Sequence, residues 1–225
     1  MCGRFSMAID SEDVQTELML GEMPESWNER FNIAPTQLAP IIRDPSSRAV
    51  EMVRWGLVPY WAKDPKIGYS LINARAESVA DKPSFKSAFK SKRCLVLTDG
   101  FYEWKSEPTN PKIKTPYYYS LKSGRPFTFA GLWDHWEPKQ GQSEHAMDTF
   151  TIITCPANVL VAQVHDRMPV MFMDEKRWRW LEETDQAILL EMLQPADPEL
   201  MRAWQVSRLI NSPQHDSADV IKPAA

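Results

Sequence analysis

The chain has 225 residues, of which 43% are hydrophobic and 25% are charged, a composition typical of a globular protein. It has no apolar run near the ~20 residues of a membrane span and no signal-peptide pattern, so we expect a cytoplasmic protein without a membrane partner. The net charge of −4 argues against a polyanion as partner, but residues 41–125 hold 16 Lys and Arg against 8 Asp and Glu. A phosphate-binding surface would therefore come mainly from this stretch, unless the imbalance is only an uneven solvated surface.

The cysteines and histidines give no sign of a disulfide framework or a metal site. Cys2, Cys94 and Cys155 are odd in number and lack metal-type spacing, and the four histidines are dispersed. We expect Cys94 and Cys155 in the core, where free cysteine is common. Eight scattered glycines form no phosphate loop. We therefore expect no metal and no cofactor.

The sequence of the first part of the chain predicts a helix, a loop, two strands and a second helix, in that order. An Asp10/Ser11 cap followed by Val14, Leu18 and Met19 on one face predicts a first helix. A proline-containing loop, FNIAP, covers residues 31–35. Two strands are expected at 39–43 and 48–55, joined by a DPSS turn, and a helix over 83–93.

The second part is dominated by short segments rich in aromatic and β-branched residues, which predict an antiparallel sheet rather than βαβ units. We expect strands at 94–99, 101–105, 115–121, 127–133 and 149–155, and helices at 158–164 and 174–193. The fold class is α+β, with a curled antiparallel sheet or open barrel-like core flanked by short helices. We expect one domain over residues 2–213 and a loose tail over 214–225.

The opening residues, MCGRF, place a cysteine next to the chain start. Methionine removal is favoured when the second residue is small, so the mature chain is expected to begin with Cys2. The same residue then carries a free α-amine and a thiol, two nucleophiles on one carbon skeleton. The ordinary alternative is a disordered terminal residue.

Three other stretches hold polar residues in unusual surroundings. LINARAES places Asn73, Arg75 and Glu77 at alternate positions, hence on one face of an extended segment, where Arg75 and Glu77 could equally form an ordinary ion pair. In DGFYEW, Glu103 stands between two aromatic residues, although a solvated outer face would also explain it. In QVHDRMPVMF, His165 follows an apolar helix that it could simply cap.

Taken in order, the motifs MCGRF, FNIAP, WGLVPYW, NARAE, DGFYEW and HDRMP resemble the SRAP family. Its members sense and shield abasic sites by cross-linking themselves to single-stranded DNA. The resemblance extends from Cys2 to about Asn211 and implies a stand-alone bacterial form in the cytoplasm, associated with the nucleoid. It assigns the chemistry to Cys2, Asn73, Glu103 and His165.

The implied chemistry accounts for the opening pentapeptide. The ring-opened abasic site is an aldehyde, the Cys2 amine attacks it to give a Schiff base, and the thiol closes a five-membered thiazolidine. Glu103 would relay protons and help remove Met1, Asn73 would hold the reacting end, and His165 would exchange protons with the sugar. Lyase activity is a natural side path, because the Schiff base permits β-elimination of the 3′ phosphate.

The implied partner is single-stranded DNA containing abasic sites, bound by a monomer. Because an absent base offers nothing to read, recognition is expected through phosphates and stacking. Arg4, Arg75 and Arg167 are the expected phosphate contacts. For the two tryptophans, core packing is the alternative to base stacking. The remaining expected DNA contacts are Asn32, Pro35 as a wedge, and Trp55 or Trp61 as stacking residues.

Two other function classes compete with this interpretation. Amidotransferases with an N-terminal nucleophile also begin with a cysteine, but they continue through glycine-rich segments and a longer domain. A non-catalytic module that binds single strands would need aromatic and basic residues but no special Cys2. The module would bind reversibly and lose DNA in high salt, whereas a covalent link survives denaturation.

Overall fold

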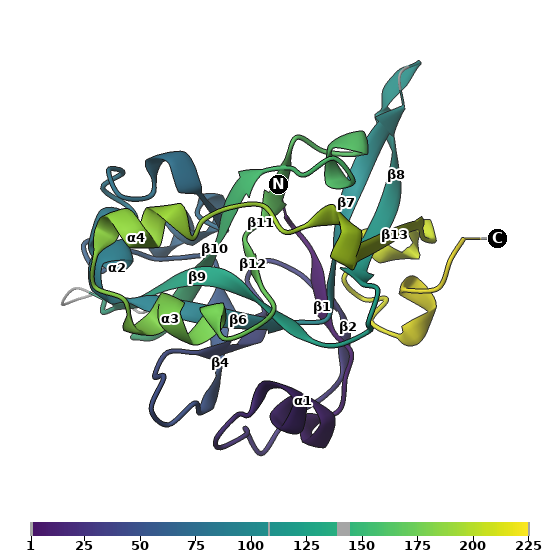
Figure 1. The fold of residues 1–225 in the computed structure, drawn as a ribbon. Helices are drawn as coiled ribbons and strands as arrows, with labels where there is room; N and C mark the ends of the chain where they lie inside the picture. The colour runs from purple at the N-terminus through teal and green to yellow at the C-terminus, as the bar shows by residue number, and fades with distance from the viewer. Residues whose placement is uncertain (1, 108, 139–144, 225) are drawn as a thin grey trace.

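A closed ring of five strands forms the centre of the fold in the computed structural model, which describes residues 2–107, 109–138 and 145–224 (Figure 1). Strand β10 pairs with both β4 and β9, and this double pairing closes the ring. The pairing of β10 with β4 is parallel, and the others are antiparallel. The order around the ring is β10 (Met147–Pro156), β4 (Val50–Trp55), β3 (Leu38–Ile42), β6 (Arg93–Thr98) and β9 (Phe127–Trp136). The expected α+β fold with a barrel-like core is confirmed.

A second, five-stranded sheet contains the first strand of the chain. Its hairpin of β7 and β8 projects beyond the body of the molecule (Figure 1). Three further short strands extend the barrel, β5 (Asn73–Arg75), β11 (Arg167–Pro169) and β12 (Met171–Phe172). The second sheet has the order β13 (Met201–Gln205), β8 (Asn110–Leu121), β7 (Gly100–Glu107), β1 (Phe5–Met7) and β2 (Arg30–Ile33).

Short α-helices flank the sheets, namely α1 (Ser11–Leu18), α2 (Lys86–Ser91), α3 (Lys176–Glu182) and α4 (Gln186–Glu191). The predicted start of α1 is confirmed, since the Asp10 carboxylate accepts from the N–H groups of Glu12 and Asp13. The helix expected over 174–193 is two helices, because the chain is extended at Glu183 and Asp185 caps α4.

The helix expected over 158–164 is wrong in type and length. Only a single 3₁₀ turn forms there, Val161–Gln163. The Asn158 side chain accepts from the backbone N–H groups of Leu160 and Val161. This local side-chain turn competes with the hydrogen bonds of an α-helix.

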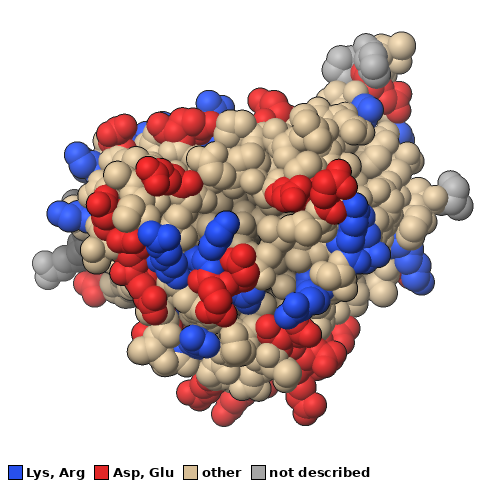
Figure 2. Space-filling view, viewed as in Figure 1, with Lys and Arg blue, Asp and Glu red and all other residues tan. Residues whose placement is uncertain are grey.

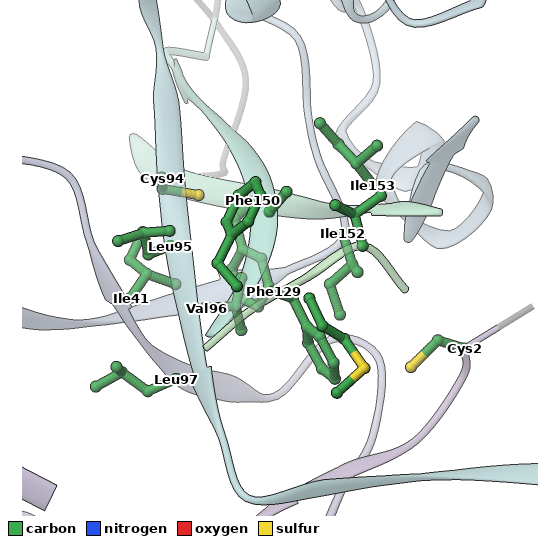
Figure 3. Close-up of a cluster of buried hydrophobic side chains, with 14 of the residues drawn as sticks. Cys2, Ile41, Cys94, Leu95, Val96, Leu97, Phe129, Phe150, Ile152 and Ile153 are labelled. Carbon is green, nitrogen blue, oxygen red and sulfur yellow. The ribbon is translucent and has the colours of Figure 1, made fainter. Parts of the chain in front are cut away.

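The apolar core joins the two sheets and includes the start of the chain. It contains residues from Cys2 to Met201 (Figure 3). Phe5 makes edge-on contacts with Trp55 and Phe129, with ring centroids 5.1 and 5.9 Å apart. Cys94 and Cys155 are buried in this core, as predicted.

The segment expected to be a loose tail is packed, which corrects that prediction for residues 214–224. Val220 is fully buried, and Pro223 bridges to Val206 beside β13. The Asp216 carboxylate pairs with Arg30 and accepts from the N–H groups of Phe31 and Asn32 on β2. Polar composition suggested a free end, but these residues satisfy the exposed edge of β2.

The surface seen in Figure 2 carries interspersed acidic and basic side chains, with acidic ones gathered where α1 lies. No helix among the described residues is long and apolar enough to cross a membrane.

At Gly56 the loop after β4 passes close to the 3₁₀ helix Pro65–Ser70. A substitution at this glycine tests the close approach. Its φ is +118°, and a Cβ there would lie 2.7 Å from the carbonyl oxygen of Gly68. We expect Gly56→Ala to lower the free energy of unfolding by more than about 2 kcal/mol, measured by urea denaturation.

Gly124→Ala is the matched control. Its φ is +73°, but a Cβ there meets nothing within 4 Å, so only the left-handed conformation costs energy, about 1 kcal/mol. Equal losses in the two variants would contradict the proposed close approach.

Candidate functional site around Cys2

Cys2 is fixed at the edge of the core. It lies three residues before β1, whose Phe5 pairs with both Ile33 and Phe101. The Cys2 side chain is fully buried, and its sulfur is directed toward the apolar cluster (Figure 3). Its Sγ lies 3.8 Å from the carbonyl oxygen of Arg4. The alternative of a disordered terminal residue is therefore wrong for Cys2.

Asn73 holds the backbone of Cys2. It opens β5, which runs parallel to β10 with Asn73 opposite Ile152. Its Nδ2 donates to the Cys2 carbonyl oxygen at 2.8 Å. Its Oδ1 is buried and accepts no hydrogen bond from the described residues. An amide in this position fixes the chain end without adding charge and keeps one acceptor available beside it.

Glu103 faces the interior rather than solvent. Along β7, Phe101 belongs to the same core as Cys2, while Tyr102 and Trp104 pack in a separate cluster on the other face. Glu103 shares the face of Phe101 and is 2% exposed. Burial raises the pKa of the Glu103 carboxyl to about 7. The alternative of a solvated outer-face residue is wrong, and this carboxyl can both donate and accept a proton near neutral pH.

The Cys2 thiol is held in its protonated form. Burial raises its pKa well above the ordinary range, and the nearby Glu103 carboxylate raises this pKa further. A thiol in this environment is a poor first nucleophile. It needs a neighbouring base, or an electrophile already attached to the same residue.

His165 and Glu103 line one cavity of about 600 Å³. The Nδ1 atom of His165 lies 3.1 Å from the backbone N of Arg167 and 2.9 Å from Oδ1 of Asp166. Burial lowers the pKa of His165, so the ring is neutral at pH 7. The other described lining residues are Arg4, Trp104, Lys112, Ile113, Lys114, Arg208 and Asn211.

Arg167 is a structural strap, and its predicted phosphate contact stays a prediction. Its two Nη atoms bind the two carboxylate oxygens of Glu77 at 2.8 and 2.9 Å, and it also donates twice to Thr154. Only 8% of the residue is exposed. Four of its five N–H groups are used within the protein. The strap joins the HDRMP and NARAE segments, so the partner of Glu77 is Arg167 rather than Arg75.

Asn32 is a second internal strap, which corrects its predicted DNA contact. It is fully buried. Its Nδ2 approaches the carbonyl oxygens of Ile210, Ser212 and His215, and its Oδ1 accepts from Arg4 Nη1 at 2.7 Å. Arg4 also donates to the Ile210 carbonyl. Asn32 therefore connects the C-terminal segment to the residue two positions after Cys2.

The two tryptophans of WGLVPYW have different surroundings. Trp55 is fully buried, and its Nε1 donates to the Ile72 carbonyl at 2.8 Å. Its predicted stacking on a base is therefore wrong, because no face of the ring reaches solvent. Trp61 is 43% exposed. Arg75 is exposed and Pro35 is half-buried, so their DNA contacts, like that of Trp61, stay predictions.

Several cavity residues were missed in the sequence. Lys112 and Lys114 fall within the basic stretch 41–125 and alternate along a strand, a pattern that could have identified them. Arg208 and Asn211 gave no such signal, because they reach the cavity from a segment about 100 residues farther along the chain.

No three His, Cys, Asp or Glu side chains in the described part of the chain are grouped as ligands of a metal ion.

The chain is similar to known proteins along nearly its whole length. The family description SOS response associated peptidase (SRAP) matches residues 1–213. A Bacillus subtilis protein named abasic site processing protein YoqW is 43% identical, with 99% of each chain covered. The Xenopus tropicalis abasic site processing protein HMCES is 28% identical over 97% of this chain and 77% of its own. A crystal structure from Bacteroides thetaiotaomicron superposes with a TM-score of 0.86 at 28% identity and covers both chains fully.

Glu103 makes stability depend on pH. Since its pKa in the folded state, about 7, exceeds the ordinary 4.5, folding is favoured while the carboxyl is protonated and loses this contribution as pH rises through 7. We expect Glu103→Gln to gain about 2 to 3 kcal/mol over the wild type in free energy of unfolding between pH 5 and pH 8.

The readout is the difference between the urea-denaturation curves of the two proteins across this range. Asp99 is also buried and has a pKa of about 6. Because both proteins contain Asp99, its contribution cancels, and the difference between the two curves reports on Glu103. Glu29→Gln, on an exposed side chain, is the control. A difference that does not change with pH would refute the raised pKa.

Asn32 is expected to stabilise the fold rather than bind ligand directly. Asn32→Ala leaves several buried groups unpaired, so we expect a loss of about 2 to 4 kcal/mol in free energy of unfolding, measured by urea denaturation. The control is Asn28→Ala, since the exposed Asn28 donates only to the nearby Ser26 carbonyl. A loss no larger than that of the control would rule out the strap.

Proposed function

Because this chain belongs to the SOS response associated peptidase (SRAP) family, we propose that it captures abasic sites in single-stranded DNA by a covalent bond to Cys2. One observation carries the proposal: Asn73 holds the Cys2 carbonyl at 2.8 Å, and the buried Glu103 carboxyl, with a pKa of about 7, is near enough to Cys2 to raise the pKa of its thiol. A fixed chain end beside a proton-transfer group is what capture of an aldehyde by an amine requires.

The first step is attack by the α-amine of Cys2 after Met1 is removed. An α-amine has a pKa near 7.7 to 8.0 and is partly unprotonated at neutral pH. It adds to the aldehyde carbon of the ring-opened abasic site. The resulting carbinolamine then loses water to give the imine. Glu103 donates the proton that the departing hydroxyl needs and takes back the proton that the nitrogen releases.

The second step closes the ring through the thiol. The S–H adds across the C=N bond: sulfur bonds to the former aldehyde carbon and the proton goes to nitrogen. One water is lost over the two steps, and no oxidant or cofactor is needed. The order follows from the buried thiol, which stays protonated until the imine is one bond away. Closure is then intramolecular and strongly favoured.

Three further activities belong to the same proposal. The neutral His165 would exchange a proton with the sugar oxygen when the sugar ring opens and when the link reverses. The imine would also permit β-elimination of the 3′ phosphate, an abasic-site lyase activity. Glu103, placed beside the chain start, would assist removal of Met1, in keeping with the peptidase of the family description.

The DNA contacts of the proposal come from exposed or half-buried groups and from one cavity residue. Arg75 would bind a phosphate, Trp61 would stack on a neighbouring base, and Pro35 would wedge against the strand. Arg4 lines the cavity, although Asn32 and Ile210 already bind its guanidinium. We propose that the protein acts as a monomer, in the cytoplasm and at the nucleoid.

The test is a denaturing gel of the purified protein with a single-stranded oligonucleotide that contains uracil, with and without uracil glycosylase. We expect a heat-stable shifted band that requires the glycosylase. Cys2→Ala and Cys2→Ser should lose it, because neither can form the thiazolidine. The intact mass of the adduct should equal the protein without Met1 plus the DNA, minus one water.

Other results would point to other function classes. A salt-sensitive complex that disappears on denaturation would indicate a reversible single-strand-binding module. If mass spectrometry shows that Met1 is gone and no band forms, covalent capture is excluded, and glutamine hydrolysis by the N-terminal cysteine becomes the next assay.

A further inference from the structure

The cavity that contains Glu103 and His165 is bounded by two walls from distant parts of the chain. One wall is the β7–β8 hairpin, with Lys112, Ile113 and Lys114. The other is the 3₁₀ helix Arg208–Asn211, which follows β13. Trp104 lies between the two walls. We call the following six lining residues the hairpin groove: Trp104, Lys112, Ile113, Lys114, Arg208 and Asn211.

The two walls of the hairpin groove are tied together. Trp104 Nε1 donates to Asn211 Oδ1 at 2.8 Å. Nη2 of Arg208 lies 3.8 Å from Oε1 of Glu107 on the hairpin. The hairpin itself is paired through Ser106 opposite Lys114 to Glu107 opposite Asn110, with a shift of register between these two pairs. The protein's own contacts therefore hold the two walls of the groove together.

The cations of the hairpin groove form few ion pairs within the described part of the protein. Lys112 and Lys114 are exposed, and neither forms an ion pair with a described carboxylate. Arg208 shares only the distant contact with Glu107. Of the four cations that line the cavity, Arg4 uses its Nη1 for Asn32 and the Ile210 carbonyl, so Lys112, Lys114 and Arg208 are the ones whose charge is mainly available to an anion.

The composition of the groove fits a phosphodiester chain better than an isolated anion. Positions two apart in a strand are separated by about 6.6 Å, comparable to the spacing of successive phosphates in an extended single strand. Ile113 and Trp104 lie among the cations and offer apolar surface to a sugar or a base. Lysine supplies a point charge that tolerates the variable geometry of a flexible backbone.

We infer that the hairpin groove binds the phosphodiester backbone of one flank of the single strand, on one side of the reacting nucleotide, through Lys112, Lys114 and Arg208. This inference rests on the proposed function and adds the residues that guide the strand into the cavity. It assigns them to binding and not to the covalent chemistry.

The first experiment measures binding without chemistry. The probe is a fluorescent single-stranded oligonucleotide with a tetrahydrofuran abasic analogue, which has no aldehyde. For the double variant Lys112→Ala/Lys114→Ala, we expect anisotropy titrations to give about 10-fold weaker binding. The slope of log K against log salt should fall by about 1.4, the value for two lost phosphate contacts.

The matched control is Lys86→Ala/Lys90→Ala, which removes two exposed lysines from α2, outside the groove. It should bind like the wild type. Equal weakening in both double variants would show only a general loss of positive charge and would overturn the inference. So would wild-type affinity and salt slope in the groove variant. Thermal unfolding midpoints of both variants establish that they are folded.

A second experiment locates the bound flank. Half-maximal cross-linking is measured with true abasic oligonucleotides whose 5′ or 3′ flank is cut to one nucleotide. We expect the difference between the wild type and the groove variant to vanish when one particular flank is removed and to persist when the other is. If the difference between the wild type and the groove variant persisted after removal of either flank, backbone binding in the groove would be excluded. Because the analogue lacks the aldehyde, its binding data remain interpretable even if cross-linking fails, so the two proposals fail separately.

Discussion

The pairing of β1 with both β2 and β7 holds the first residues of the chain inside a sheet. Chain ends are normally mobile, because few contacts offset the entropy lost when they become ordered. Here that entropy is offset by two strand pairings, by the burial of Phe5 against Trp55 and Phe129, and by the hydrogen bond from Asn73 to the Cys2 carbonyl. A nucleophile at a terminus gains from this arrangement, since its position is fixed before substrate arrives. The other features of the site depend on it.

Burial then determines the protonation of the site. The same desolvation that keeps the Cys2 thiol protonated brings the Glu103 carboxyl to a pKa of about 7 and keeps His165 neutral. At neutral pH the Glu103 carboxyl is therefore divided between its acid and its carboxylate form, while the Cys2 thiol stays protonated. Such a site suits imine chemistry, in which one proton must be given to a leaving hydroxyl and another taken from nitrogen.

The cationic groups divide into two classes that their sequence positions do not distinguish. Arg167 and Arg4 stand beside reactive residues in the chain, yet their guanidinium groups bind Glu77, Asn32 and backbone carbonyls. They hold segments together around the site. The more exposed cations that line the cavity, Lys112, Lys114 and Arg208, lie on a hairpin and on a segment near the C-terminus. Internal straps and external contacts therefore both use basic residues, and burial separates the two roles.

The sequence by itself determined the α+β class and most of the strands, and it supplied the candidate residues of the site. Local patterns suffice for these features, since strand propensity, the Asp10 cap and the order of the motifs are all short-range. It also placed Cys94 and Cys155 in the core correctly. Only the tertiary structure decided that β10 closes the ring and that residues 214–224 pack against β2. Only the fold assigned Asn32 and Arg167 to straps and buried Trp55. These outcomes depend on contacts between residues far apart in the sequence. Such contacts produce no local or periodic sequence pattern from which they could be predicted.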